Sequence, residues 1–421
     1  MKMESLLILG RQPALGLAEL ESLYGAKAVQ TAGTHAAVVD VDPCLLAFDR
    51  LGGSTKFAKV LTTLDTIDWR EIEKFLLNVS PGHSQSMPKG KMQLGLSLYG
   101  FDLTKQRITA TGLNLKKAIK KTDRSVRLVP NQSSELNSAQ VIHNHLTGPN
   151  GWELLFVRDK DKTIIAQTVK VQDIAAYTRR DRERPNRDTK VGMLPPKLAQ
   201  IIVNLAAGLV PEESRQSICD IPAGQPLPPS LIPGQTILDP FCGSGVVLQE
   251  ASLMGYDIYG SDIDSRMVEY SNKNLTWLLN QPGYNSLPYG SDGPSPHLEI
   301  ADATTHTWKN FTFVGSETYL GRPFTSRPSP EILAQTISDC NQIIKKFLKN
   351  LASQTRPGLR ICLAVPAWQI KQNQFQHLPL IDQIADLGYT QVSFEHAGTD
   401  QLIYYRPDQF VARELIVIIR K

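Results

Sequence analysis

A strand, a glycine-rich loop and a helix follow one another directly in the middle of the chain, and this arrangement constrains the fold most. Thr236–Asp239 is an apolar strand pattern that ends in a carboxylate, Asp239–Gly245 reads DPFCGSG, and Val246–Leu253 is a helical pattern. In an open, doubly wound sheet, ligands bind at the carboxyl ends of the strands, where this loop is expected to lie. Gly243 and Gly245 allow backbone to approach a ligand, and the helix amides point toward it.

The rest of the C-terminal half alternates strand and helix patterns, which predicts a largely parallel sheet covered by helices. The expected strands are Thr236–Asp239, Asp257–Ser261, Leu298–Ala301, Thr312–Val314, Leu359–Val365, Gln391–Phe394 and Leu415–Ile419. The predicted fold class is therefore α/β, with a doubly wound, Rossmann-like sheet in residues 193–421.

The first 170 residues predict two smaller α/β units, because a chain of 421 residues exceeds what one core usually organises. The loop-forming stretch Ser80–Lys91 follows a helix expected over Trp69–Leu77, and it divides the units into residues 1–88 and 89–170. Arg179–Lys190 is highly charged with mixed signs and predicts a connector within residues 171–192.

Three carboxylates follow successive expected strands, and their positions suggest a cofactor. The Asp239 carboxylate can bind an amino group. Asp262 can accept hydrogen bonds from ribose hydroxyls, and Asp302 can accept one from an adenine amine. A dinucleotide is disfavoured because its fingerprint needs a glycine where Leu248 stands. The prediction is S-adenosylmethionine, bound by Asp239, Phe241, Gly243, Gly245, Asp262 and Asp302.

The alternative interpretation is that these three acids have only local structural roles. Asp239 would cap a helix, Asp262 and Asp264 would cap the helix that starts near Ser265, and Asp302 would be a turn residue. For Asp264 the helix cap is the favoured interpretation.

The DPFCGSG loop is similar to that of THUMP-domain tRNA guanine-N2 methyltransferases and their relatives among RNA and DNA amino-methyltransferases. Gly192–Ala199 looks like the family's segment before the catalytic sheet, and Arg406–Glu414 looks like its closing hairpin. The resemblance implies an N-terminal ferredoxin-like domain, a THUMP domain that binds RNA, and methyl transfer to N2 of a guanine in RNA, tRNA in particular.

The family carries Asp/Asn-Pro-Pro-Tyr/Phe after the fourth strand, where this chain reads Ser316-Glu317-Thr318-Tyr319. The resemblance assigns Ser316 and Glu317 as acceptors for the target amine and Tyr319 as the stacking ring. Both prolines are missing, so three outcomes stay open: an altered amine site, a site for another nucleophile, or an inactive binding protein. For His306, Cys242 and Cys362, structural roles are favoured over catalytic ones.

Ten basic residues lie between Gln85 and Pro130, but only two acidic residues, Asp102 and Asp123. The net charge of the whole chain is only +4. Together with the resemblance, this stretch predicts an RNA surface, and a solvated helix face is the alternative. The candidate RNA-binding residues are Lys116, Lys117, Lys120, Lys121, Arg124 and Arg127.

Other functional classes are disfavoured. The five cysteines form no CxxC pair, so no metal site is expected, and no apolar run reaches the length of a membrane span. With no signal-peptide pattern at the start, a cytoplasmic location is expected. Two alternatives to the tRNA enzyme remain: a noncatalytic tRNA-binding protein that retains the cofactor fold, and a DNA amino-methyltransferase.

Overall fold

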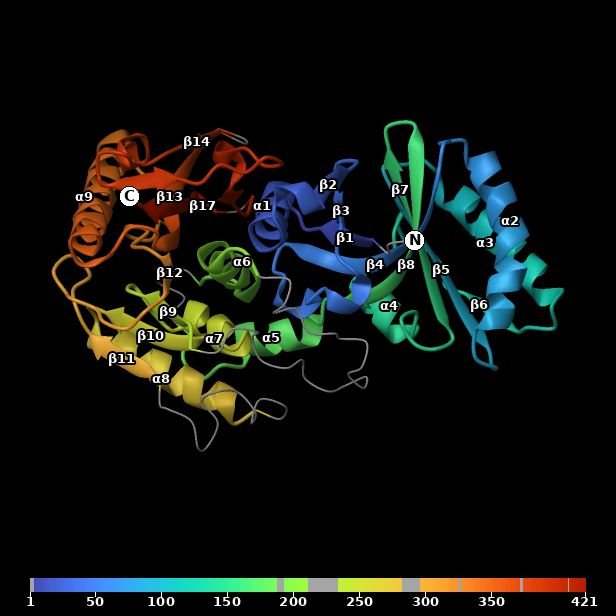
Figure 1. The fold of residues 1–421 in the computed structure, drawn as a ribbon, viewed down its shortest axis with the longest axis horizontal. Helices are drawn as coiled ribbons and strands as arrows, with labels where there is room; N and C mark the ends of the chain where they lie inside the picture. The colour runs from blue at the N-terminus through green and yellow to red at the C-terminus, as the bar shows by residue number, and fades with distance from the viewer. Residues whose placement is uncertain are drawn as a thin grey trace. The chain divides into compact units, whose positions relative to one another are not determined.

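The computed structural model describes residues 4–187, 193–210, 234–281, 296–324, 327–371, 374–407 and 409–421. These residues divide into two units (Figure 1). The first comprises residues 1–13, 27–48 and 54–174, and the second comprises residues 14–26, 49–53 and 175–421. The first segment of the chain therefore contributes to both units.

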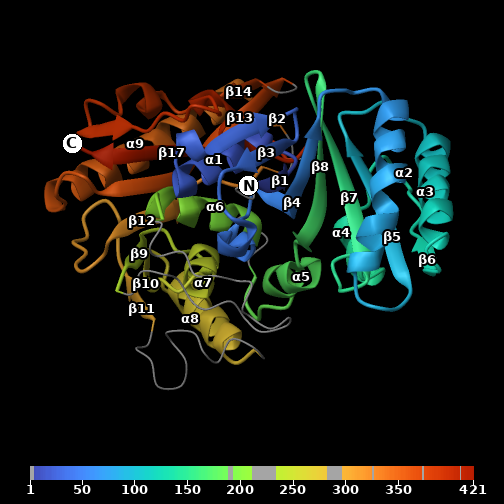
Figure 2. The same ribbon diagram turned by 45° about the vertical axis from the view of Figure 1, so that its right-hand side comes forward.

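The first unit is built on one eight-stranded sheet in the order β2-β3-β1-β4-β8-β7-β5-β6. Its strands are β1 (Ser5–Leu9), β2 (Val29–Ala32), β3 (Ala36–Val39), β4 (Ser54–Leu64), β5 (Met92–Tyr99), β6 (Val126–Leu128), β7 (Gly151–Asp159) and β8 (Lys162–Val171). Helices α2 (Trp69–Ser86) and α3 (Lys105–Lys120) lie side by side and bury their apolar faces on β5 to β8 (Figures 1 and 2). Helix α4 (Ser138–His143) packs against a separate small cluster that includes Val171.

The second unit carries the predicted doubly wound sheet, in the order β11-β10-β9-β12-β13-β17-β15. The strands are β9 (Thr236–Asp239), β10 (Asp257–Asp262), β11 (His297–Ile300), β12 (Phe313–Glu317), β13 (Arg360–Lys371), β15 (Tyr389–Gln391) and β17 (Val411–Arg420), with β14 (Gln374–Gln376) and β16 (Ile403–Tyr404) at the side. The first five in spatial order are parallel, and β17 runs antiparallel to β13. Their carboxyl ends therefore meet at one edge.

Helices cover both faces of this sheet. One face carries α6 (Pro196–Ala207), α7 (Val246–Leu253) and α8 (Ser265–Leu279), and the other carries the long helix α9 (Pro330–Gln354) (Figure 2). Buried side chains of α9 pack on Leu238, Val314 and Leu363 in the main core. Helix α1 (Pro13–Tyr24) and helix α5 (Ile174–Arg182) also belong largely to this unit.

Helix α2 continues beyond its expected end at Leu77, although Pro81 removes one backbone donor. The predicted loop over Ser80–Lys91 is therefore wrong in its first half. The guanidinium of Arg124 donates to the carbonyls of Ser84, Met87 and Pro88. This contact satisfies backbone groups that a helix end leaves unpaired, and no local pattern around Pro81 reveals it.

Other elements also differ from the sequence-based expectation, and strand β15 ends at Gln391, where a strand over Gln391–Phe394 was expected to begin. Helix α5 extends into the charged stretch that was expected to be a connector, of which residues 188–190 lie outside the described part. Strand β12 runs three residues further than expected and includes Glu317. Strand β4 was not predicted, because its Lys56 is buried against Glu153 and interrupts the apolar alternation.

Candidate active site

The loop between β9 and α7 contains two glycines with positive φ, and side chains of α8 donate hydrogen bonds to its backbone. Gly243 and Gly245 have φ of 51° and 83°, a backbone conformation that favours glycine. A side chain on Gly245 would meet Ser271 Oγ at 2.9 Å. Ser271 Oγ donates to the Gly243 carbonyl at 2.7 Å, and Asn274 Nδ2 donates to the Ser244 carbonyl at 2.8 Å. The loop is thus a preformed cradle at the start of a helix.

Asp239 lies at the centre of the edge where the parallel strands end. Its carboxylate is 1% exposed, accepts from Ser316 Oγ at 2.6 Å, and accepts from the Phe241 amide at 3.3 Å. Burial raises the pKa of Asp239 to about 7, against the lowering effect of these two hydrogen bonds. The side chain does not cap α7, whose N-cap residue is Gly245.

Asp262 is in the neighbouring strand and braces the same loop. It accepts from the Gly243 amide and from the Asp264 amide, both at 2.9 Å, and burial raises its pKa. Asp264 caps α8 by accepting from the Arg266 amide, which confirms the predicted cap. Asp302 is exposed and accepts from the Thr304 amide and hydroxyl at 2.8 Å, so the structure shows it in a turn.

Two isoleucines that sequence reasoning missed stand beside these acids. Ile263 and Ile300 are 70% and 62% exposed, and Ile300 is the strand partner of Asp262. Large aliphatic side chains at this exposure next to a ligand-type carboxylate can cover the flat faces of a bound ring. The available sequence signal was an isoleucine at each of two strand ends: Ile263 directly follows β10, and Ile300 is the last residue of β11.

The tetrapeptide Ser316–Tyr319 was expected after the fourth strand, but its first two residues belong to β12. Ser316 is fully buried, and its hydroxyl donates to Asp239. Glu317 Oε1 accepts from Arg413 Nε at 2.7 Å, and Arg413 on β17 is itself buried. Tyr319 is 43% exposed. The structure therefore presents an ion-paired carboxylate and a partly open ring at this edge, and Arg413 is a residue whose role sequence reasoning missed.

The remaining candidates have structural contacts. The Phe241 ring packs edge-on against Phe347, with ring centroids 5.1 Å apart. Cys242 and Cys362 are buried, and burial raises the pKa of each thiol. Lys197 Nζ lies 5.0 Å from the centre of the Tyr177 ring.

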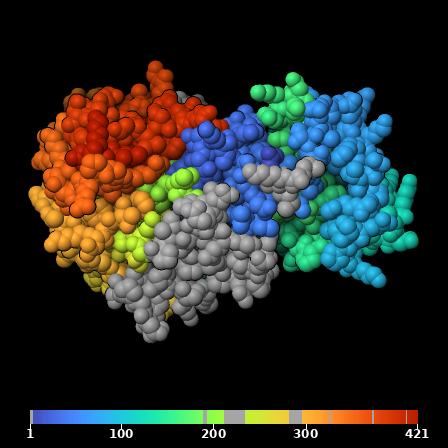
Figure 3. Space-filling model, in the orientation of Figure 1, coloured from blue at the N-terminus to red at the C-terminus, as the bar shows by residue number. Residues whose placement is uncertain are grey.

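The predicted RNA residues of the first unit are mostly on its surface. Lys117, Lys120, Lys121 and Arg127 are exposed, and Lys116 is half-buried. Arg124 differs, because both terminal nitrogens of its guanidinium donate to backbone or to Asn150. Figure 3 shows the outer side of α2 and α3 at the surface, at the right-hand end of the view.

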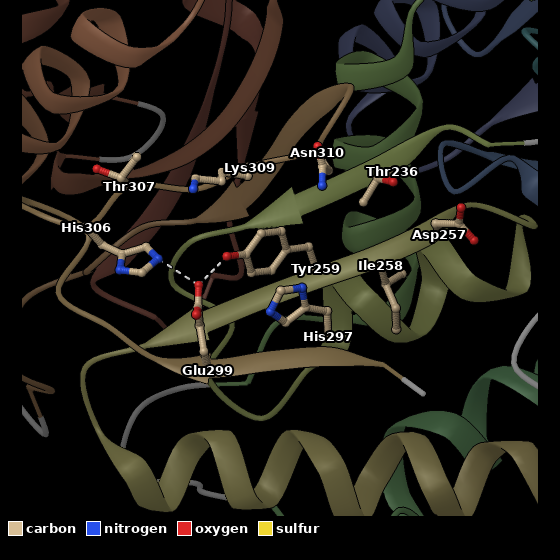
Figure 4. Close-up of a pocket in the computed structure, with 10 residues that line it drawn as sticks. All are labelled: Thr236, Asp257, Ile258, Tyr259, His297, Glu299, His306, Thr307, Lys309 and Asn310. Atoms are coloured by element: carbon tan, nitrogen blue, oxygen red, sulfur yellow. Dashed lines mark hydrogen bonds and ion pairs between the residues drawn. The ribbon is translucent and has the colours of Figure 1, made fainter. Parts of the chain in front are cut away.

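A cavity of about 510 Å³ lies near the amino-terminal ends of β9, β10 and β11, the opposite edge from Asp239 (Figure 4). In it, Glu299 pairs with His306 Nε2 at 2.7 Å and with the Tyr259 hydroxyl. None of the residues predicted to bind cofactor or substrate lines this cavity. The pairing of His306 agrees with the structural role expected for it.

The sheet order and the glycine loop define the second unit as a Rossmann-like α/β domain, and its carboxyl edge is the candidate ligand site. No helix among the described residues is long and apolar enough to cross a membrane.

Comparisons with known proteins find a family model and curated relatives that match parts of the chain. Residues 228–273 match the family model N6_N4_Mtase, described as DNA methylase. The chain is 39% identical over 84 residues to the tRNA (guanine(10)-N2)-dimethyltransferase of Methanothermobacter thermautotrophicus, covering 20% of this chain and 18% of the relative. It is 38% identical over 65 residues to the ribosomal protein L11 methyltransferase of Helicobacter hepaticus, covering 15% and 20%. The aligned segments thus span about a fifth of either relative.

A likeness also extends over the whole length of a solved structure. The crystal structure of TrmN from Thermus thermophilus covers 100% of both chains at 13% identity, with a TM-score of 0.49. At this score the likeness does not by itself identify the fold.

Proposed function

We propose that this chain is an S-adenosylmethionine-dependent methyltransferase that methylates N2 of a guanine in tRNA. The observation that carries the proposal is the carboxyl edge of the second sheet, where Asp239 and Asp262 lie at the glycine loop and Asp302 follows the neighbouring strand β11. The similarity to a tRNA (guanine(10)-N2)-dimethyltransferase supports the choice of substrate. With tRNA as the partner, the cytoplasm is the proposed compartment.

The residues at this edge fit the cofactor. Asp239 would hold the amino group, Asp262 the ribose hydroxyls and Asp302 the adenine amine, with Ile263 and Ile300 against the adenine faces. Bound there, S-adenosylmethionine supplies an electrophilic methyl group on sulfur. Gly243 and Gly245 carry no side chain, and their positive φ disfavours any residue that does.

Glu317 is the proposed acceptor for the target amine, and it compensates for the missing Asp/Asn-Pro-Pro sequence. An ionised carboxylate has about four acceptor positions, and Arg413 uses one of them on Oε1. The others can accept the N1–H and N2–H donors on one edge of guanine. As the target amine gains its methyl group, Glu317 would take the proton that this nitrogen loses and pass it to water.

Ser316 and Tyr319 have supporting roles in this proposal. Because Ser316 is buried on Asp239, we assign it to positioning that carboxylate rather than to contact with the base. Tyr319 offers its ring for stacking on a flipped base.

For the first unit we propose a THUMP-like domain over residues 89–170, preceded by a ferredoxin-like domain over residues 1–88. The proposed RNA surface is formed by Lys116, Lys117, Lys120, Lys121 and Arg127. Arg124 is left out, because its guanidinium supports the end of α2.

The direct test is mass spectrometry of nucleosides after incubation of the full chain with S-adenosylmethionine and unfractionated tRNA. Formation of N2-methylguanosine is expected. Cofactor binding without any methylated nucleoside would support the noncatalytic tRNA-binding alternative instead. The match to a DNA methylase model favours one second candidate, and methylated adenine or cytosine in a parallel reaction with DNA would establish it.

Arg413 gives a sharper test of the proposed role of Glu317. Arg413→Met should lower kcat roughly ten- to a hundredfold, because the acceptor loses its orientation, while the affinity for S-adenosylmethionine stays unchanged. Arg413→Lys should recover part of the rate, and Arg356→Met is a control at an exposed arginine. An equal loss of cofactor affinity in Arg413→Met would contradict a role on the substrate side.

A further inference from the structure

A buried arginine without a hydrogen-bond partner lies just after α5. The side chain of Arg184 is 2% exposed, and none of its three nitrogens has a partner among the described residues. A guanidinium stays charged at any physiological pH, and a buried charge without acceptors is strongly unfavourable. Burial accordingly lowers the pKa of Arg184. The arrangement is that of a binding site whose acceptor none of the described residues supplies.

A second donor nearby is also unsatisfied. Asn186 Nδ2 is buried and has no partner among the residues that the structure describes. The unsatisfied atoms of the two side chains are all donors, which fits an acceptor ligand and not a cation. This observation is independent of the charge on Arg184.

The backbone of this segment is clamped to the elements that form the cofactor loop. The Asn186 amide donates to Asn274 Oδ1 at 2.9 Å, and Asn274 Nδ2 donates to the carbonyls of both Asn186 and Ser244. Ser244 belongs to the glycine loop. One side chain of α8 therefore holds the Arg184 segment and the glycine loop together.

The nearest acidic groups do not fill the site. Asp181 and Glu250 act on Arg184 through their charge, and Arg187 opposes them. Glu250 is engaged by Arg180, which donates from Nε at 2.8 Å and from Nη2 at 3.2 Å. Figure 2 shows α5, which carries Arg180, close to α7, which carries Glu250.

We propose that Arg184 and Asn186 form an oxyanion-binding site beside the glycine loop, for a carboxylate or a phosphate. The planar fork of a guanidinium matches both groups with two parallel hydrogen bonds. Two sources can supply the anion: the carboxylate of the cofactor's methionine part, or a phosphate of the RNA. The buried, unsatisfied donors by themselves indicate an oxyanion site. The choice of these two anions depends on the proposed function.

Inorganic phosphate is the first probe, used with the full chain in thermal melting at constant ionic strength. Replacing chloride by phosphate should raise Tm of the wild type and leave Tm of Arg184→Met unchanged. In chloride alone, Arg184→Met should melt no lower than the wild type, because it removes a buried unpaired charge. Arg187→Met, at an exposed position of the same segment, should respond to phosphate like the wild type.

Calorimetry separates the two sources. S-adenosylhomocysteine and 5′-methylthioadenosine share the adenosine and the sulfur, but only the first has a carboxylate. If the cofactor is the source, Arg184→Met weakens S-adenosylhomocysteine about tenfold or more and leaves 5′-methylthioadenosine unchanged. If RNA is the source, both affinities stay unchanged and tRNA binding weakens with a reduced salt dependence.

An equal phosphate effect on the wild type and on Arg184→Met, with no change in either binding assay, would overturn the proposal. Arg184→Lys keeps the positive charge but loses the two parallel donors of the guanidinium. It tests the site if Arg184→Met does not fold, and phosphate should raise its Tm less than that of the wild type. A wild type that binds no S-adenosylhomocysteine would refute the proposed cofactor, whereas the phosphate melts would still decide on the oxyanion site.

Discussion

Asp239 combines nearly complete burial with a position at the end of a strand. Its pKa is raised to about 7 because burial penalises the carboxylate more than the Ser316 hydroxyl and the Phe241 amide stabilise it. The negative charges of Asp262 and Glu317 raise it further. A cationic amino group arriving at this position would reverse the balance, because it favours the ionised form.

Binding of S-adenosylmethionine should therefore depend on pH. Asp239 is protonated below its raised pKa and becomes a carboxylate above it, so the affinity should increase roughly eightfold from pH 6 to pH 7.5. Calorimetry across this range checks the prediction. Ser316→Ala removes a hydrogen bond that lowers the pKa and should move the midpoint to higher pH, and Asp239→Asn should bind weakly with no midpoint.

Gly245 allows a test of the cradle with an internal control. A Cβ there would meet Ser271 Oγ at 2.9 Å, whereas Gly234 has a similar φ of 80° with nothing within 4 Å of an added Cβ. Gly245→Ala should reduce cofactor affinity roughly tenfold or more because the loop must shift, while Gly234→Ala should keep it. Equal affinities for the two variants, measured by calorimetry, would argue against a cradle at this loop.

At the scale of elements, α1 is anchored in the second unit by a buried polar network. Glu19 accepts from the Gly52 and Gly53 amides at 2.9 Å and from Asn204 Nδ2 at 2.7 Å. Arg50 donates to Asn204 Oδ1 at 3.0 Å and to the Tyr256 hydroxyl at 3.1 Å. A segment from the start of the chain is thus part of the unit that holds the candidate active site.

Glu19→Ala should destabilise this unit by about 2 to 4 kcal/mol, because three buried donors lose their acceptor. Chemical denaturation followed by tryptophan fluorescence measures the change in the free energy of unfolding. Glu71→Ala, at an exposed helical position, should change it little. A Glu19→Ala protein as stable as the control would show that water replaces the lost acceptor at no cost.

At the scale of the whole molecule, the proposed function divides the work between the two units. The second unit would hold the cofactor and the target base, and the basic surface of the first unit would bind RNA phosphates. Replacing Lys117, Lys120 and Lys121 by glutamine should weaken tRNA binding and reduce its salt slope by up to about 0.9 per lost phosphate contact. Lys346→Gln with Lys349→Gln, exposed on α9, is the matched control in filter binding at several salt concentrations. An unchanged slope would exclude this surface as the RNA contact.

The cofactor loop and the strands around it were predictable because their signals are local. The strand over Thr236–Asp239 is confirmed with its expected limits, and the helix that Asp264 caps follows directly in sequence. The end of α2 was predicted wrongly, because Arg124, 40 residues from Ser84, satisfies the backbone there. The roles proposed for Ser316, Glu317 and Tyr319 stay predictions until they are tested.

The sequence by itself determined the α/β class, the cradle between β9 and α7, and the carboxylates at the strand ends, since backbone preferences and strand periodicity act over a few residues. Only the tertiary structure decided that Glu317 meets Arg413 across 96 residues, that Ser316 turns toward Asp239, and that Arg184 is buried with no acceptor among the described residues. The physical reason is that burial and charge pairing depend on which distant segments come together, and the residue pattern along the chain does not contain that information.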